Sequence, residues 1–514
     1  MADDGAQSLP GLELESFWGQ TRVRVDEWRL HEAWYDAQPW TRRRGGPLPR
    51  RRALRGMVDP LHFRIQPYGL FPRGMHRSLF GSFVLHVLAH HDLVQVSGPD
   101  GFARLDEEAA GRLLLTDPFP PSEVHDAIAA DPVGSLEDRV LNGIHPFALR
   151  RTSPTEAELS VDWTGSTMES AERGSGRRRY LPNVGASFDL GPDGPALRSI
   201  AIAFPHVAAI TRVTRDSPPE LLRQGVAILR SALVLAGEID VHLMCHVLAE
   251  HVQLALRALP DGDPVRALLG PHVDGADVIN CVGDWLILGE QGVVCATTPL
   301  TAADLARRTA DALRASLQGW DTFAPRAPLG PSDRYARAAN VFWDALEGYV
   351  SAAIPTYDRE VAQTLEAELH ALEVADWTVT VPPIADLAGL RRFCRYVVFH
   401  ATFLHGWVND AQWDDGGDPD HTPLSVRSPP DPAATYDAWR AGQARVPRVD
   451  VAYQKIIANA LTRFDVGLAT RDDLLPRSPP GFADLVRGLG PPFVDAGGAD
   501  QRLVRDWIRS RLNS

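Results

Sequence analysis

The sequence has few cysteines and no excess of positive charge. Its 514 residues include only 4 cysteines, and 52 Lys and Arg residues stand against 66 Asp and Glu residues, a formal net charge of -14. Sparse cysteine without a CxxC pair predicts a reducing compartment and no disulfide framework. The acidic excess argues against a nucleic-acid binder, because such binding requires clustered positive charge.

The sequence also lacks a secretory signal and an apolar run long enough to span a membrane. Its start, MADDGAQSLPGLELESFWGQ, has no basic segment followed by an apolar one. The apolar stretch 226–237 is interrupted by Arg230 and is shorter than the roughly 18–20 residues of a membrane span. We therefore expect a cytoplasmic protein without stable membrane insertion. A P-loop, a GxSxG motif and an HExxH motif are also missing, which argues against nucleotide-dependent and common hydrolase chemistry.

The hydrophobic pattern predicts a mainly α fold with minor β structure in the N-terminal half. Residues 197–204 alternate in polarity and end at Pro205, which is typical of a strand. From residue 219 onward, apolar residues recur at spacings of three and four, which is typical of helices. Helices are predicted at 219–258, 302–318, 334–354, 359–374, 384–409, 453–462 and 500–512.

Two of the predicted helices each carry a pair of polar residues that can bind a transition metal. His242 and His246 are four residues apart and so lie on one helix face, ~6 Å apart along the axis. His405 and Asn409 have the same spacing within another apolar helix. If these helices pack face to face, three imidazoles and one amide can bind one ion, a ligand set typical of non-heme iron.

Spacing alone leaves another interpretation of these histidines open. A buried histidine is often a core residue whose ring is hydrogen-bonded to the backbone, and this chain has 17 histidines. His251 and His400 lie five residues from His246 and His405, respectively, and are equally well placed by spacing. Periodicity does not choose among them.

Five segments, in their order along the chain, together resemble the lipoxygenase family. They are LNGIHP followed by Arg150 and Arg151; HVLAEHVQLALRALPDGDPVRALLGPHVDGADVIN, residues 246–280; Leu286, Ile287 and Gly292 after it; FWDALE with Tyr349 and Val350; and HGWVN, residues 405–409. The resemblance implies a mainly helical catalytic domain around a long central helix, with non-heme iron between helices.

The resemblance also implies a domain organisation. We expect one lipoxygenase-like catalytic domain over 1–514, with a divergent N-terminal part at 1–140 and the core at 141–514. Only about 140 residues precede Asn142, so the amino-terminal β-sandwich of many animal and plant members is expected to be absent.

The chain departs from the family's ligand pattern on the central helix. The family takes two ligands there at a spacing of five, across a locally widened turn. His405 and Asn409 match the later ligand pair, and His242 matches the second central ligand if one residue is deleted before His246. The first ligand then falls at or near Gly237, which cannot bind a metal. We expect this deletion to convert the widened turn to regular α-helix and to recruit His246; alternatively, only one central ligand survives.

A second departure concerns the negative charge beside the iron. Family chains end in a segment that brings a terminal carboxylate to the metal, whereas this chain stops just after the predicted helix 500–512. Three imidazoles and an amide leave the charge of a buried iron uncompensated, which is costly. The candidate anions are Ser514 at the terminus, Asp410, Glu238, Asp240 and Glu250.

The expected substrate is apolar. The family's stereocontrol position corresponds to Gly283, which implies oxygen insertion of the R type, and a neighbouring family arginine is replaced by Asp284, which disfavours entry of a fatty acid carboxylate first. The predicted channel residues are Leu243, Leu248, Phe399, Phe403 and Leu404.

The leading hypothesis is a non-heme iron oxygenase of lipoxygenase type. It would take hydrogen from an unsaturated fatty acid or polyene and add O2. Two alternatives stay open: an iron-free lipoxygenase-fold protein that binds lipids or partners, and a metal oxidase with a different reaction in specialised metabolism.

Overall fold

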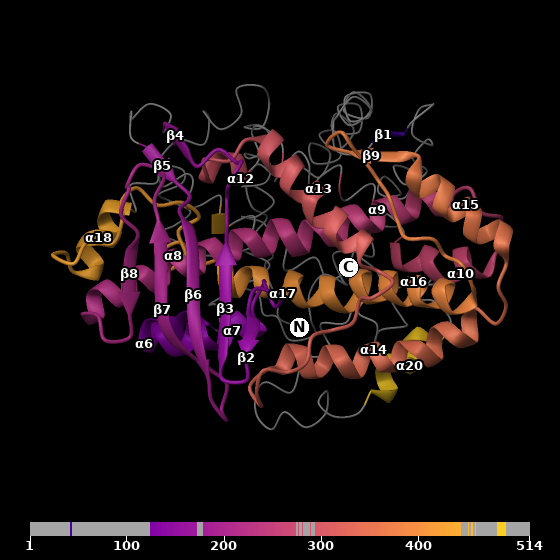
Figure 1. Ribbon diagram of the computed structural model, residues 1–514, viewed down its shortest axis with the longest axis horizontal. Helices are drawn as coiled ribbons and strands as arrows, with labels where there is room; N and C mark the ends of the chain where they lie inside the picture. The colour runs from indigo at the N-terminus through magenta and orange to yellow at the C-terminus, as the bar shows by residue number, and fades with distance from the viewer. Residues whose placement is uncertain are drawn as a thin grey trace, which may run out of the picture.

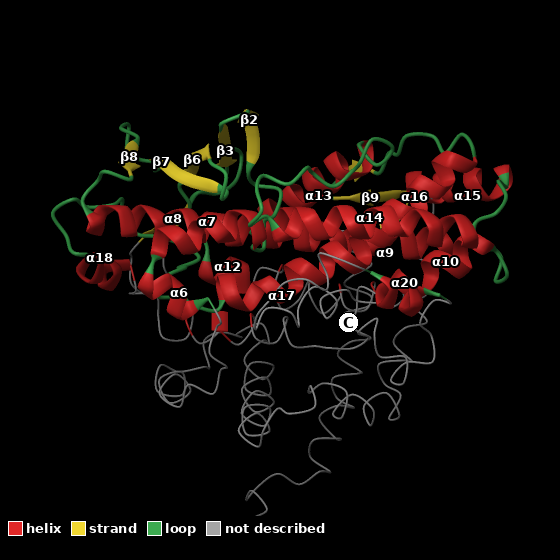
Figure 2. Cartoon of the chain, turned by 90° about the horizontal axis from the view of Figure 1, so that it is seen from below, coloured by secondary structure: helices red, strands yellow, loops and turns green. Residues whose placement is uncertain are grey.

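The computed structural model describes residues 42–43, 124–171, 178–273, 276, 280, 288, 293–443, 451, 454–455, 458 and 481–489. Within these residues a layer of long helices carries a β-sheet on one face at one end (Figures 1 and 2). The mainly α fold class with minor β structure in the N-terminal half is confirmed. Most of 1–140, most of the predicted helix 453–462 and all of 500–512 lie outside the described residues, so the single-domain organisation stays a prediction.

The helices and strands follow one another along the chain with these bounds: β1 Arg42–Arg43, α6 His125–Ala130, α7 Pro132–Asn142, β2 Arg150–Ser153, β3 Glu156–Val161, β4 Glu169–Ala171, β5 Arg178–Tyr180, β6 Asn183–Leu190, β7 Pro195–Ala203, β8 Thr211–Thr214, α8 Pro219–Ala236, the π-helix η2 Gly237–Leu243, α9 Met244–Leu256, α10 Pro264–Val273, α12 Val293–Thr297, α13 Ala302–Gln318, α14 Arg334–Ala353, α15 Arg359–His370, β9 Leu372–Val374, β10 Trp377–Thr378, α16 Leu387–Phe399, the π-helix η4 His400–Leu404, α17 His405–Gly416, α18 Tyr436–Gln443 and α20 Phe482–Gly488.

The centre of the fold is a helix of 38 residues formed by α8, η2 and α9 end to end (Figure 1). It begins with Pro219 in its first turn, where a missing N–H costs nothing. By length and composition this helix could cross a membrane, but 83% of its most apolar window is buried inside the protein, as expected of a core helix. The predicted helix over 219–258 is confirmed.

A second long helix, formed by α16, η4 and α17, packs against the central helix. Asp386 caps its start by accepting a hydrogen bond from the Gly389 N–H at 2.7 Å. Phe403 of η4 stacks on Phe342 of α14 with ring centroids 5.3 Å apart, and Phe399 contacts both rings. The predicted channel residues Leu243, Leu248, Phe399, Phe403 and Leu404 are all buried in the core. Their role as a channel lining stays a prediction.

The main sheet is antiparallel, with strand order β2-β3-β6-β7-β8, and it packs on α7 and α8 (Figure 2). Alternate residues of β6, such as Val184 and Phe188, are buried against these helices. The strand predicted over 197–204 is β7. The helix predicted over 359–374 is too long, because its last residues form β9, which pairs with β1 and β10.

Candidate metal centre

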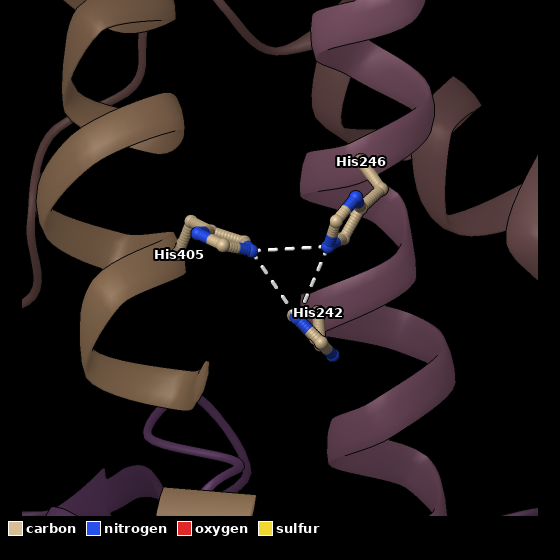
Figure 3. Close-up of side chains that lie close together, drawn as sticks. All are labelled: His242, His246 and His405. Carbon is tan, nitrogen blue, oxygen red and sulfur yellow. Dashed lines mark hydrogen bonds between the residues drawn. The ribbon is translucent and has the colours of Figure 1, made fainter. Parts of the chain in front are cut away.

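Three histidines from the two long helices meet between them. His242 lies near the end of η2, His246 one turn later in α9, and His405 at the start of α17. Their Nε2 atoms form a triangle with sides of 3.2 Å (His242 to His246), 3.2 Å (His242 to His405) and 3.0 Å (His246 to His405) (Figure 3). The sequence predicted that these side chains converge, and the structure brings them together.

The outer nitrogens of two of these rings are hydrogen-bonded away from the triangle. Nδ1 of His242 lies 2.9 Å from Oε2 of Glu238, and Nδ1 of His246 lies 2.9 Å from Oδ1 of Asn280. Since the amide oxygen of Asn280 accepts, Nδ1 of His246 carries the proton and its Nε2 presents a lone pair to the triangle. Burial lowers the pKa of both histidines to about 3, so both rings are neutral at pH 7. An ion at the centre of the triangle would be bound by the Nε2 lone pair of each ring in this tautomer.

The dimensions of the triangle fit a metal ion. Imidazole nitrogens bind transition metals at about 2.1 Å, so three donors at right angles around one ion lie about 3.0 Å apart. The observed separations of 3.0 to 3.2 Å match this value. Neutral imidazole is also the protonation state that binds a metal. The residues present therefore fit an ion with open positions for further ligands.

Asn409 and Gln412 lie on the α17 side of the triangle. Asn409 is buried one turn after His405, and its Oδ1 accepts a hydrogen bond from Nε2 of Gln412 at 3.1 Å. Nε2 of Gln412 lies 3.4 Å from Nε2 of His242. Asn409 Nδ2 and Gln412 Oε1 are buried without a hydrogen-bond partner in the described part of the chain. The role of Asn409 as a fourth ligand stays a prediction.

Sequence reasoning missed Gln412. It lies seven residues after His405, two helical turns along the same face, and this spacing was the available signal.

The expected conversion of the widened turn to regular α-helix is wrong. Residues Gly237 to Leu243 form a π-helix, and a second π-helix, His400 to Leu404, immediately precedes His405. A side chain at position 237 is excluded by packing, because an added Cβ would lie 2.8 Å from the carbonyl oxygen of Ile144 and 2.9 Å from its carbonyl carbon. The backbone of Ile144 thus occupies the space of a first ligand, and His246 completes the triangle instead.

Two carboxylates back the triangle without reaching its centre. Glu238 is hydrogen-bonded to Nδ1 of His242, and Glu250 accepts from Nδ2 of Asn280 at 2.8 Å while Asn280 bonds His246. Burial, together with the charge of Asp415, raises the pKa of Glu238 to about 8. Carboxylates behind metal-binding histidines orient the rings and increase their basicity.

The other anion candidates are engaged elsewhere or fall outside the description. Asp240 forms a two-bond ion pair with Arg308, with distances of 2.7 Å each. The side chain of Asp410 and all of Ser514, Gly283 and Asp284 lie outside the described residues, so predictions about them stay predictions.

His251 and His400 do not join the triangle. Nδ1 of His251 bonds the Val247 carbonyl oxygen at 2.7 Å, and Nδ1 of His400 bonds that of Tyr396 at 2.8 Å. Both side chains are buried. They are core histidines hydrogen-bonded to the backbone and not members of the candidate metal site.

Sequence comparisons find distant relatives of known activity. No protein-family model matches the chain. A linolenate 9R-lipoxygenase of Nostoc sp. is 29% identical over 223 residues, covering 41% of this chain and 28% of that protein. A human hydroperoxide isomerase, ALOXE3, is 24% identical over 253 residues, covering 45% of this chain and 35% of that protein. The matches thus span about a third of the curated relatives' length.

Structure comparisons find the same fold over more of the chain. The crystal structure of a 9R-lipoxygenase from Cyanothece has a TM-score of 0.64 at 22% identity and covers 78% of this chain and 67% of that one. A LOX solved in complex with arachidonate has a TM-score of 0.59 at 16% identity, covering 74% of this chain and 70% of the other.

Proposed function

Because the chain is a distant member of the lipoxygenase family, we propose that it is a non-heme iron oxygenase acting on an unsaturated fatty acid or polyene with O2. The observation that carries the proposal is the triangle of Nε2 atoms of His242, His246 and His405, with sides of 3.0 to 3.2 Å. Three imidazoles that point at a common centre, of which His242 and His405 are buried and His246 is partly buried, suit a transition-metal ion.

The side chains around the triangle hold its geometry. Glu238 and Asn280 hold the ring orientations of His242 and His246 from behind, and Asn280 also fixes the tautomer of His246. The carboxyl groups of Glu238 and Glu250 lie behind the imidazoles and do not bind the ion directly. A bound cation would favour the ionised form of Glu238, whose pKa burial raises to about 8. Asn409 is the proposed fourth ligand, with Gln412 holding its amide.

The chemistry supplied by iron in such a site is one-electron oxidation of a weak C–H bond, after which O2 adds to the carbon radical. The helices contribute a buried, apolar setting. His242 and His405 are each only 2% exposed, so bulk water is kept from the reacting atoms.

The substrate class follows from the relatives named for linolenate and arachidonate. By sequence, Asp284 takes the position of a family arginine, and an acidic residue there would repel a carboxylate, so we propose tail-first entry of a polyunsaturated chain or a neutral polyene.

The decisive experiment measures iron in untagged protein reconstituted with Fe(II) under anaerobic conditions, by inductively coupled plasma mass spectrometry. We expect about one iron per chain. The substitutions His242→Ala, His246→Ala and His405→Ala should each abolish iron retention. His251→Ala and His400→Ala are matched controls, because they remove buried histidines from the same two helices whose Nδ1 atoms bond only backbone.

O2 consumption with linolenate, arachidonate and a neutral polyene then tests the reaction. Uptake that follows iron content supports an oxygenase. Retained iron without uptake for any of these substrates contradicts the proposed reaction and favours a different oxidation. A protein that binds no iron overturns the enzyme proposal and leaves a lipid-binding protein, the function that Gly237 in place of a first ligand would favour.

A further inference from the structure

A second group of metal-binding side chains lies at the other end of α17 from His405. His125 is the first residue of α6, and Asp418 and His421 follow the end of α17. The Nδ1 atoms of both histidines approach one oxygen, Oδ2 of Asp418, at 2.6 and 2.7 Å. Because α17 has 12 residues, its length of about 18 Å separates this group from His405. The two groups are therefore separate sites.

Asp418 is held in place and stays ionised. Its Oδ1 accepts the Asp420 N–H at 3.2 Å, and its carbonyl oxygen accepts the N–H groups of His421 and Thr422. The side chain is 7% exposed. Burial alone would raise the pKa of this carboxyl, but the hydrogen bonds and charges of His421 and His125 lower it to about 2. A fixed carboxylate therefore faces two imidazoles.

We propose that His125, Asp418 and His421 bind one divalent transition-metal ion of the zinc class. Two imidazole nitrogens and one carboxylate oxygen are ligands that zinc uses, with water in the fourth position. All three ligand atoms lie within 4.8 Å of one another. His125 is 48% exposed, which leaves a side open to water.

Binding requires only a small rearrangement. Ligand atoms at about 2.1 Å from a tetrahedral ion lie about 3.4 Å apart, so the two short contacts to Asp418 open by less than about 1 Å. The ring of His125 is 48% exposed, so it has room to move by this amount. The ring of His421 stacks on Tyr436 with centroids 6.2 Å apart, which keeps it beside Asp418. Binding at Nδ1 requires the neutral tautomer of each histidine that carries its proton on Nε2.

An ion at this position would connect segments that are far apart in the sequence. His125 and Asp418 are 293 residues apart, and the ion would fix α6 to the end of the helix that begins with His405. The role we assign is structural, and it does not depend on iron binding at the first site.

The test uses untagged protein carrying His246→Ala, which disables the first site. The protein is incubated with Zn²⁺, desalted, and measured for zinc content and for its thermal unfolding midpoint. We expect about one zinc per chain and a higher midpoint with Zn²⁺, because a ligand that binds only the folded state stabilises it. Adding Asp418→Asn or His421→Gln should abolish both effects.

His206→Gln is the matched control, because His206 is an exposed histidine that bonds one carboxylate, Glu169, without a second imidazole. Zinc binding and the midpoint shift should survive it. If Asp418→Asn does not fold, His125→Gln takes its place in the test, because a substitution at this half-exposed side chain should not prevent folding. Zinc content near zero in the His246→Ala protein, or zinc retained equally after Asp418→Asn, overturns the proposal. Loss of iron binding at the first site would leave this result unaffected.

Discussion

The backbone of Ile144 lies against Gly237 so closely that a Cβ at position 237 would come 2.8 Å from the Ile144 carbonyl oxygen. Ile144 is held there by its N–H, which donates to Oδ2 of Asp415 at 2.8 Å, and Asp415 belongs to α17, the helix of His405. One backbone segment thus packs between the two helices that carry the histidines. The glycine at position 237 is what allows the Ile144 backbone to pack this closely.

Replacing Gly237 should therefore destabilise the protein. Gly237→Ala places a methyl group against backbone atoms that cannot rotate away, and overpacking of this kind costs about 1–3 kcal/mol. The control is Gly348→Ala, an exposed helical glycine of α14 with no atom within 4 Å of the added Cβ. That change should stabilise by up to about 1 kcal/mol through helix propensity. Chemical denaturation measures both, and equal effects would contradict the close packing.

The ion pair between Arg139 and Asp415, which holds Ile144 in place, should also contribute to the stability of the fold. Arg139 binds both oxygens of Asp415, with distances of 2.6 and 2.8 Å, and Asp415 is 4% exposed. Asp415→Asn leaves the buried arginine uncompensated, so we expect a loss of about 3–5 kcal/mol in the free energy of unfolding. The control Asp344→Asn removes an exposed partner of Arg395 and should cost less than about 1 kcal/mol. A small effect of Asp415→Asn would show that the pair does not hold the loop.

Sequence reasoning could predict what depends on periodicity and could not predict what depends on packing. The spacing of four between His242 and His246 predicts that both lie on one face, and in the structure both lie beside His405. The helix 302–318 was predicted with its observed bounds, where Thr301 and Asp304 form a capping box.

The persistence of the π-helix at Gly237 was not predictable, because it depends on Ile144, a residue 93 positions earlier whose approach no local pattern records. The role of Glu238 was missed for a similar reason. It was a candidate for a direct ligand, yet in the π-helix it bonds the outer nitrogen of His242.

Glu238 should control metal affinity through its charge. A bound cation favours the ionised form of Glu238, whose pKa burial raises to about 8. Glu238→Gln keeps an oxygen that can accept from Nδ1 of His242 but cannot ionise, so we expect iron affinity to fall about 10–100-fold. Asp240→Asn is the control, because Asp240 is two residues away on η2 and pairs with Arg308 instead. Competition with a chelator gives both dissociation constants. An affinity unchanged by Glu238→Gln, but lowered by Glu238→Ala, would assign Glu238 an orienting role only.

Buried histidines outside the triangle should make the metal-free protein sensitive to acid. Burial lowers the pKa of His145, His251 and His400 to about 4, well below the ordinary value of 6.5. Below pH 6.5 these histidines bind protons in the unfolded chain, whereas in the folded chain they stay neutral down to about pH 4. Each histidine therefore removes up to about 1.4 kcal/mol of stability per pH unit across this window. Unfolding free energies measured between pH 7 and pH 5 should fall less steeply in His251→Gln than in the unmodified protein. An identical slope in His251→Gln and the unmodified protein would mean that His251 is protonated as readily in the folded state as in the unfolded one.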